Sequence, residues 1–260
     1  MQLDAADLAD FYEGPLGLLT RRIVTRQLRA MWPSAKGARL LGYGFAVPYL
    51  RQFQAEVERV VAVMPAQQGV VAWPAALPLT ALSDEAALPF PDAFFDRILV
   101  VHGLEGADAT RPLLRQLWRV LAPEGRLLLV APNRASLWAQ LERSPFAVGR
   151  PFSRGELDRL LRGALFEPLA WGRALYVPPF HGRRLVRTGT GWDRLLRRLF
   201  PGLSGVHVVE AGKTFYGAVL MPALRATPQW KAREAPSPTF TSPAQRPRDF
   251  VNSTSSKRDL

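Results

Sequence analysis

The sequence predicts an α/β protein with a doubly wound, mostly parallel sheet and helices on both of its faces. Short apolar runs at 57–63, 97–101 and 126–131 are typical of strands that are buried on both sides. Predicted helices, such as 47–54 and 110–121, separate these runs. This alternation indicates parallel strands joined by right-handed crossovers. Ligand sites in such sheets lie at the carboxyl ends of the strands.

The composition limits the class of protein. The chain has 260 residues, 48% of them hydrophobic, which is enough for one α/β domain with additions or for two small domains. The absence of cysteine excludes disulfides, thiolate metal sites and a cysteine nucleophile. His181 and His207 have no metal-ligating neighbours at short spacing, so we expect no metal site.

The chain is strongly basic. Its 34 Lys and Arg against 22 Asp and Glu give a formal net charge of +12. Such a charge is typical of proteins that bind nucleic acid, an anionic membrane or an acidic protein, but an arginine-rich, lysine-poor composition from a GC-rich genome is the favoured explanation. The N-terminus lacks the pattern of a signal peptide, and no apolar run reaches about 18 residues. We therefore expect a cytoplasmic protein without a membrane span.

The predicted elements follow one another in order. Helical periodicity extends over residues 4–31, and Gly14-Pro15 divides it into two helices. Ser153 and Glu156 have the capping-box spacing of a helix N-terminus.

Three further segments have less regular patterns. Residues 70–73 fit a helix or a strand, and the proline-rich residues 74–92 predict a loop. A strand is expected within 168–176. Two runs, 206–210 and 214–221, flank Ala211-Gly212-Lys213, and this spacing predicts an antiparallel hairpin.

The stretch 38–48 is the one around which the other predicted elements are arranged, although its Gly-x-Gly-x-Ala pattern is common by chance. Leu40 suits the end of a buried strand, and Gly42 and Gly44 permit backbone angles that side chains forbid. Pro48 fits the first turn of a helix. A strand, a glycine turn and a helix N-terminus together predict a site where a nucleotide approaches the main chain.

We expect one domain over residues 1–222 and a flexible, basic tail rich in proline and serine over 223–260. Ahead of the tail, residues 183–200 have the pattern of a basic amphipathic helix. This segment could cover the cleft, touch a membrane surface, dock a protein partner, or lie solvated over the sheet. Its arginines and apolar residues are Arg183, Arg184, Arg187, Arg194, Arg197 and Arg198, with Leu185, Trp192, Leu195, Leu196, Leu199 and Phe200.

Four stretches together resemble the class I S-adenosylmethionine-dependent methyltransferases of the type 11 kind. They are 40–46 (LLGYGFA), 88–96 (LPFPDAFFD), 102–105 (HGLE) and 118–127 (WRVLAPEGRL). The second and fourth stretches are specific in combination, whereas the first alone is not. The resemblance is best over 35–135, and 136–205 corresponds to the variable part that binds a substrate or partner. It implies a Rossmann-like, seven-stranded sheet with a reversed last hairpin.

The resemblance also implies where S-adenosylmethionine would bind. The implied cofactor-binding residues are Gly42, Tyr43, Gly44, Met64, Asp84, Glu85 and His102. Asp84 falls where the family has an acid that contacts adenine.

Two positions depart from the family pattern. The family usually has an acid two residues before the first motif glycine and another at the end of the second strand. Here Leu40 and Met64 stand at these positions, which predicts weaker cofactor binding. Gln67 or Gln68 could compensate.

Three functions remain open at this stage. The first is methyl transfer to a small molecule, in which the protein chiefly positions the reactants. The second is a degenerate methyltransferase fold that serves as a partner-binding subunit, for example of a glyoxalase II-type hydrolase. The third is an RNA-associated methyltransferase, although nucleic-acid binding is the less favoured explanation of the charge. His102 and Glu105 are candidates for a catalytic base or an orienting group at the cleft mouth, and a structural histidine and a helix-start glutamate explain them as well.

Overall fold

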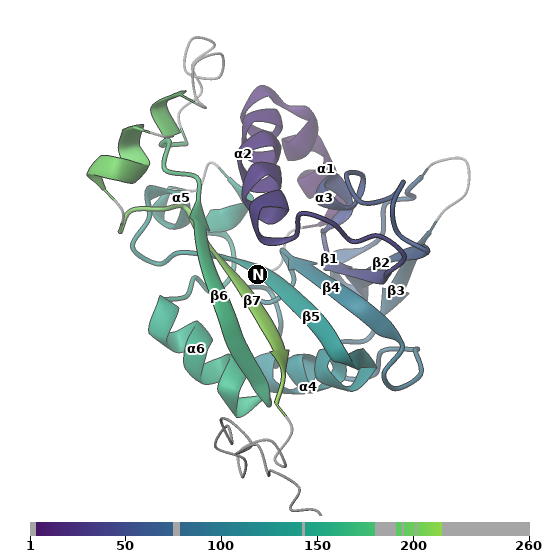
Figure 1. Cartoon of the computed structure of the whole chain (residues 1–260). Helices are drawn as coiled ribbons and strands as arrows, with labels where there is room; N and C mark the ends of the chain where they lie inside the picture. The colour runs from purple at the N-terminus through teal and green to yellow at the C-terminus, as the bar shows by residue number, and fades with distance from the viewer. Residues whose placement is uncertain are drawn as a thin grey trace, which may run out of the picture. The chain divides into compact units, whose positions relative to one another are not determined.

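The computed structural model describes residues 4–74, 79–141, 144–179, 191–193, 195–200 and 202–214. Its centre is a seven-stranded sheet with the order β3-β2-β1-β4-β5-β7-β6 (Figure 1). Neighbouring strands are parallel except at β7, which is antiparallel to β5 and β6. The predicted sheet with a reversed last strand is therefore confirmed. The strands are β1 Arg39–Gly44, β2 Arg59–Pro65, β3 Thr80–Ser83, β4 Phe95–Val101, β5 Leu121–Pro132, β6 Phe166–Ala174 and β7 Val206–Lys213.

Helices cover both faces of this sheet, as predicted. One face packs against α1, α2, α3 and α5, and the other against α4 and α6 (Figure 1). Each face buries its own cluster of aliphatic and aromatic side chains, which is the layered arrangement of a doubly wound fold. The helices are α1 Ala5–Glu13, α2 Pro15–Met31, α3 Val47–Leu50, α4 Thr110–Val120, α5 Leu137–Gln140 and α6 Arg154–Gly163, with the short 3-10 turns η1 Ala66–Gln68 and η2 Pro145–Ala147.

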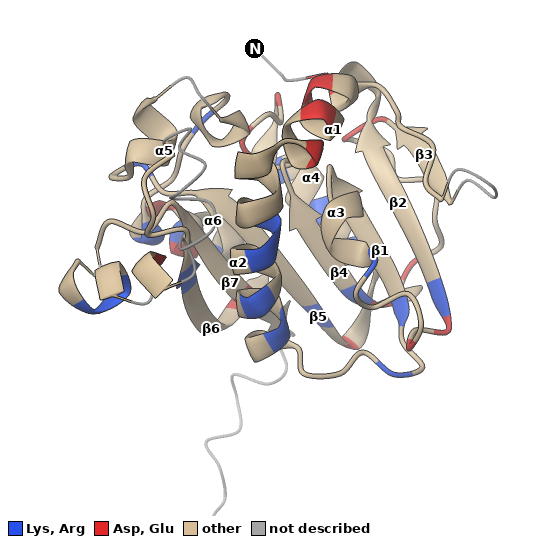
Figure 2. Ribbon diagram, turned by 90° about the horizontal axis from the view of Figure 1, so that it is seen from above, with Lys and Arg blue, Asp and Glu red and all other residues tan. Residues whose placement is uncertain are grey.

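The N-terminal helices divide where the sequence predicts. Gly14 ends α1 by donating its N–H to the carbonyls of Asp10 and Phe11, and Pro15 begins α2. Acidic residues occur along α1 and basic residues along α2 (Figure 2). The capping box is also confirmed: the main-chain N–H of Ser153 donates to Glu156 Oε2 at 2.8 Å, and Glu156 N–H donates to Ser153 Oγ at 3.3 Å.

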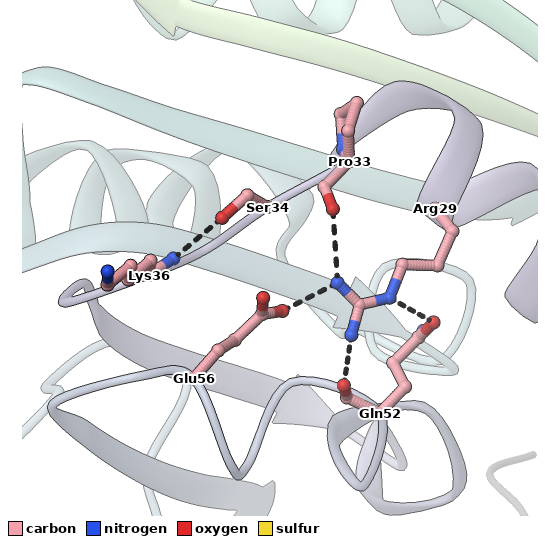
Figure 3. Close-up of polar contacts among 6 residues, drawn as sticks. All are labelled: Arg29, Pro33, Ser34, Lys36, Gln52 and Glu56. Carbon is pink, nitrogen blue, oxygen red and sulfur yellow. Dashed lines mark hydrogen bonds and ion pairs between the residues drawn. The ribbon is translucent and has the colours of Figure 1, made fainter.

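Helix α3 is shorter than the predicted helix over 47–54, and Arg29 contacts the non-helical chain that follows it. Its guanidinium donates to Glu56 Oε1 at 2.6 Å, to Gln52 Oε1 at 3.1 Å and to the carbonyl oxygen of Gln52 (Figure 3). A longer helix would use that carbonyl for the N–H of residue 56. The guanidinium therefore fixes a non-helical turn and ties it to the last turn of α2. Strand β2 begins two residues later than predicted.

Arg119 plays a similar part on the other face. Its guanidinium donates to the carbonyl oxygens of Leu88 and Phe90 at 2.7 and 2.8 Å, and to the carboxylate of Asp92 at 2.7 Å. This arginine in α4 thus holds the loop that leads into β4.

Three predictions for individual segments are wrong. The hairpin expected around Ala211–Lys213 is continuous strand, because Gly212 pairs with Arg126 on one side and with Glu167 on the other. The partner of β7 is instead β6, the strand predicted within 168–176. Within the predicted loop 74–92, the short edge strand β3 pairs with β2. Residues 70–73 are neither helix nor strand.

Several predictions fall outside the described residues. These include the tail 223–260, residues 215–221, His181 and the arginines at 183, 184, 187 and 194. Of the basic segment, 191–193 and 195–199 are helical. In the described residues, no helix is both long and apolar enough to cross a membrane.

Candidate functional site

The carboxyl ends of β1, β2 and β4 meet where the sheet order changes direction. Gly44 ends β1 with φ +74°, and a Cβ there would lie 2.4 Å from the Val101 carbonyl oxygen and 2.8 Å from Gly103 Cα. Only glycine fits both this backbone angle and this approach of β1 to the chain after β4. The predicted glycine turn is present at this residue.

Gly42 is different, and its predicted place in the turn is wrong. It lies within β1, opposite Ala62 and Leu99. A Cβ there would meet Leu50 Cδ1 at 2.6 Å, so Gly42 allows α3 to pack closely on the sheet. If Gly44 is taken as the first motif glycine, the position of the family's acid, two residues earlier, is Gly42. Like Leu40, Gly42 has no carboxylate. Leu40 belongs to the core.

The end of β2 also lacks an acid. Met64 pairs with Leu82 inside the sheet and is fully buried in the core. Four residues later, Gln68 is 2% exposed and donates from Nε2 to the carbonyl oxygen of His102 at 3.3 Å. This amide therefore reaches from the chain after β2 to the chain after β4. Its Oε1 is buried without a hydrogen-bond partner among the described residues.

A cavity of about 280 Å³ lies beside this point. Its walls are Pro65–Gln67 after β2, Asp84–Ala86 after β3, and residues 108–112 at the start of α4. The Asp84 side chain is exposed, and Glu85 Oε2 accepts from the N–H of Asp108 at 3.1 Å. The structure thus brings the two predicted acids to one cavity.

The Tyr43 hydroxyl is buried and makes no hydrogen bond within the described ranges. Burial raises the pKa of Tyr43 well above its ordinary value, and the Glu85 and Asp84 carboxylates raise it further. The phenol consequently remains a proton donor at neutral pH. An unpartnered buried donor is rare in proteins and indicates a place for an acceptor.

On the other side of Gly44 lies a chain of buried polar side chains. The Tyr12 hydroxyl lies 2.9 Å from the Tyr49 hydroxyl and 2.9 Å from His102 Nε2. His102 Nδ1 lies 3.1 Å from Glu105 Oε1. A carboxylate at Nδ1 favours the tautomer with its proton there, which leaves Nε2 to accept from Tyr12. Burial raises the pKa of Tyr12, which keeps its hydroxyl protonated.

The structure revises the predicted setting of His102 and Glu105. They are 5% and 7% exposed, so neither stands at an open cleft mouth. Glu105 lies five residues before α4 and is not a helix-start residue. Tyr12 connects them to a second cavity of about 210 Å³, whose lining includes Tyr12, Arg21 and Arg51. Sequence analysis missed Tyr49, because nothing in its local pattern distinguishes it from a core residue.

No group of three or more His, Cys, Asp or Glu side chains that could hold a metal ion occurs in the part of the chain described.

Comparisons with known proteins agree with this geometry. A family model described as a methyltransferase domain matches residues 41–129. A solved structure of an S-adenosylmethionine-dependent methyltransferase from Archaeoglobus fulgidus is 18% identical, with a TM-score of 0.53 over 74% of this chain and 94% of that one. Residues 41–129 thus match the methyltransferase domain family, and the chain has the class I methyltransferase fold.

Other relatives of the methyltransferase domain are known in more detail. The 1,6-didemethyltoxoflavin-N1-methyltransferase of Burkholderia thailandensis, solved with its substrate and S-adenosylhomocysteine, is 18% identical with a TM-score of 0.50, over 81% of this chain and 87% of that one. The ubiquinone/menaquinone biosynthesis C-methyltransferase UbiE of Pectobacterium carotovorum is 50% identical over 44 residues, 17% of this chain. The UbiE protein of Bordetella avium is 42% identical over 60 residues, 23% of this chain. The matches span only 18% and 23% of these two relatives' lengths.

The family implies S-adenosylmethionine, and the described residues fit its nucleoside end. The cavity between β2, β3 and α4 offers an exposed carboxylate at Asp84. Tyr43 is not in its lining, but the Glu85 and Asp84 carboxylates that line the cavity both raise the pKa of Tyr43. The residues at the family's two acid positions supply no carboxylate.

Proposed function

We propose that this protein is an S-adenosylmethionine-dependent methyltransferase that acts on a small molecule. One observation carries the proposal: a cavity lined by Asp84 and Glu85 opens at the carboxyl ends of β2 and β3, where a methyltransferase fold binds ligands. Relatives named for small-molecule products, UbiE and the toxoflavin-pathway enzyme, support this class of acceptor.

The nucleoside end of the cofactor would lie in this cavity. Asp84 Oδ1 accepts from the N–H of Ala86 at 2.7 Å, so Oδ2 would accept from the exocyclic amine of adenine. The Gly44 turn would present main chain to the methionine end. When bound, the cofactor supplies a methyl group already activated by the sulfonium charge. The protein's task is then to hold the acceptor in line and keep water out.

Gln68 would take over the role of the missing acid after β2. Its Nε2 is fixed on the His102 carbonyl, so its unpartnered Oε1 has a defined direction. This oxygen can accept from a ribose hydroxyl. A neutral acceptor contributes about 1 kcal/mol less than a charged one, which corresponds to roughly fivefold weaker binding than a carboxylate would give.

Tyr12, His102 and Glu105 would receive a proton from the acceptor. Tyr12 lines the second cavity, whereas His102 and Glu105 lie behind it. An acceptor hydroxyl in this cavity would pass its proton to the Tyr12 oxygen as Tyr12 passes its own to His102 Nε2. The Glu105 carboxylate would stabilise the resulting imidazolium. Tyr12 is then the catalytic residue, and Glu105 positions His102.

Calorimetric titration with S-adenosylhomocysteine tests the proposal directly. We expect saturable heat for the wild type and weaker binding for Asp84→Asn and Tyr43→Phe. Gln68→Met should weaken binding by roughly fivefold, the value of one neutral hydrogen bond. Gln140→Met, an exposed glutamine on α5, is the matched control. Absence of heat at millimolar ligand would refute the proposal and favour the partner-binding alternative.

A further inference from the structure

Exposed apolar side chains gather in one short part of the chain. Ten large hydrophobic side chains are exposed among the described residues, and five of them fall between residues 192 and 203. Their exposed fractions range from 48% to 60%. A soluble protein normally scatters such residues singly, so a cluster of this kind marks an interaction surface. The five are Trp192, Leu195, Leu199, Phe200 and Leu203, and we call them the apolar strip.

The apolar strip belongs largely to a helix with a basic character. Residues 191–193 and 195–199 are helical. Trp192, Leu195 and Leu199 recur at spacings of three and four, which places them on one side of a helix. Six arginines occur between residues 183 and 198 against a single acid, Asp193.

Asp193 faces the domain and fixes the helix in place. It is 8% exposed, and its Oδ1 accepts from the N–H of Tyr176 at 2.8 Å. The single carboxylate of the segment is therefore used for anchoring. Arg197 lies on the same side as Asp193, because the two line one cavity with residues of α2 and β6, whereas Arg198 is exposed and is not in the lining of that cavity.

The strip continues into a hollow formed with α5. The hollow has a volume of about 230 Å³, and its lining includes Leu137, Trp138, Val177, Leu196 and Phe200. Leu137 is itself 46% exposed. The helix of residues 191–199, green in Figure 1, lies on the α5 side of the fold, away from β3. The apolar strip and α5 therefore form one surface, distinct from the cofactor cavity between β2, β3 and α4.

We propose that this surface binds an anionic lipid bilayer peripherally. Tryptophan, leucine and phenylalanine beside arginines form the composition of helices that lie in the membrane interface. The formal net charge of +12 adds long-range attraction to an anionic surface. Nucleic acid would use the arginines but would leave the apolar residues exposed to water. The inference does not depend on the proposed methyl transfer.

Sedimentation of the full chain with lipid vesicles tests this proposal. One vesicle preparation is phosphatidylcholine alone, and the other is phosphatidylcholine mixed with phosphatidylglycerol. We expect the protein to sediment with the mixed vesicles and to be released by salt. Arg198→Gln should weaken binding by roughly fivefold, the contribution of one arginine near an anionic membrane.

A second variant tests the apolar contribution. Trp192→Ser, Leu199→Ser and Phe200→Ser together should reduce vesicle binding by more than roughly tenfold, because the apolar area that enters the bilayer is lost. The matched controls are Leu169→Ser, an exposed leucine on β6, and Arg59→Gln, an exposed arginine on β2. Both controls should bind as the wild type does, and circular dichroism should show the same fold for all variants.

Three results would overturn the proposal. The first is no sedimentation with the mixed vesicles. The second is undiminished binding by the triple serine variant. The third is a wild-type dimer in analytical ultracentrifugation that the triple variant converts to a monomer, without vesicle binding, which would assign the surface to a second copy of the chain.

Discussion

Two buried histidines in this domain have opposite surroundings. His102 and His207 are each 5% exposed. His102, after β4, has Tyr12 at one ring nitrogen and Glu105 at the other. His207, within β7, has no hydrogen-bond partner at either ring nitrogen among the described residues. Burial and the nearby Arg173 and Arg154 lower the pKa of His207 to about 4. His102 is held by a side chain at each ring nitrogen, whereas burial keeps His207 neutral at pH 7.

The largest effect should come from breaking the approach of β1 to the chain around His102. Gly44→Ala adds a Cβ at 2.4 Å from a backbone oxygen, at φ +74°. We expect a loss of about 3 kcal/mol in the free energy of unfolding, from backbone strain and overpacking. Urea unfolding measures it.

Two other glycines serve as references for that measurement. Gly42→Ala should cost less, about 1–2 kcal/mol, because the Leu50 side chain that it meets can move. Gly163→Ala, with nothing within 4 Å of its Cβ, should stay within about 0.5 kcal/mol of the wild type. Equal losses at all three positions would contradict the close approach at Gly44.

The pH dependence of stability should report on His207. Its pKa is about 4 in the folded state and 6.5 ordinarily, so the unfolded chain binds more protons between these values. The contribution of neutral His207 to the free energy of unfolding is complete above pH 6.5. It decreases by up to about 3 kcal/mol as the pH falls towards 4. Urea unfolding at a series of pH values measures this loss. His207→Leu should flatten the curve in this range, and an unchanged slope would show that another group titrates.

The hydroxyl groups near His102 should differ in their contributions to stability. Tyr12→Phe leaves His102 Nε2 and the Tyr49 hydroxyl without their shared partner, and we expect a loss of about 2 kcal/mol. Tyr49→Phe removes only the end of this chain of hydrogen bonds and should cost about 1 kcal/mol. Thermal unfolding of the two variants compares them. A larger loss of stability in Tyr49→Phe than in Tyr12→Phe would show that Tyr12 is not the central member of these hydrogen bonds.

The smallest effect on stability should occur at the open cavity. The exposed Asp84 contributes little to folding, so Asp84→Asn should change the free energy of unfolding by less than about 0.5 kcal/mol. Its effect should be confined to ligand affinity. A large loss of stability would mean that the carboxylate is structural and not available to a ligand.

Most of the sheet could be predicted from sequence because its central strands are buried on both faces. Their continuous apolar runs separate them from helices and loops. The prediction failed where this signal is absent. β3 has four residues at the sheet edge, and only Ser83 is buried. Gly212 has the composition of a turn, but strands on both sides of it hold it in β7.

The candidate site was predictable only where its residues are close in sequence. Asp84 with Glu85, and His102 with Glu105, lie within a few positions of each other. Tyr12 hydrogen-bonds to His102, which is 90 residues away in the sequence, and to Tyr49, which is 37 residues away. No local pattern contains such contacts. The role of Gly42 could not be predicted for the same reason. Its close contact with Leu50 depends on how α3 packs on the sheet, and the glycine motif carries no information on that packing.

The hydrogen bonds of Arg119 explain physically why two of the stretches that resemble the methyltransferase family occur together. Two of the four stretches, LPFPDAFFD and WRVLAPEGRL, are joined by this one guanidinium, which grips two carbonyls and a carboxylate of the first from within the second. A lysine, with a single nitrogen, has no planar fork with which to reach all three. The two stretches therefore form one structural unit, and each indicates the family chiefly when the other is present.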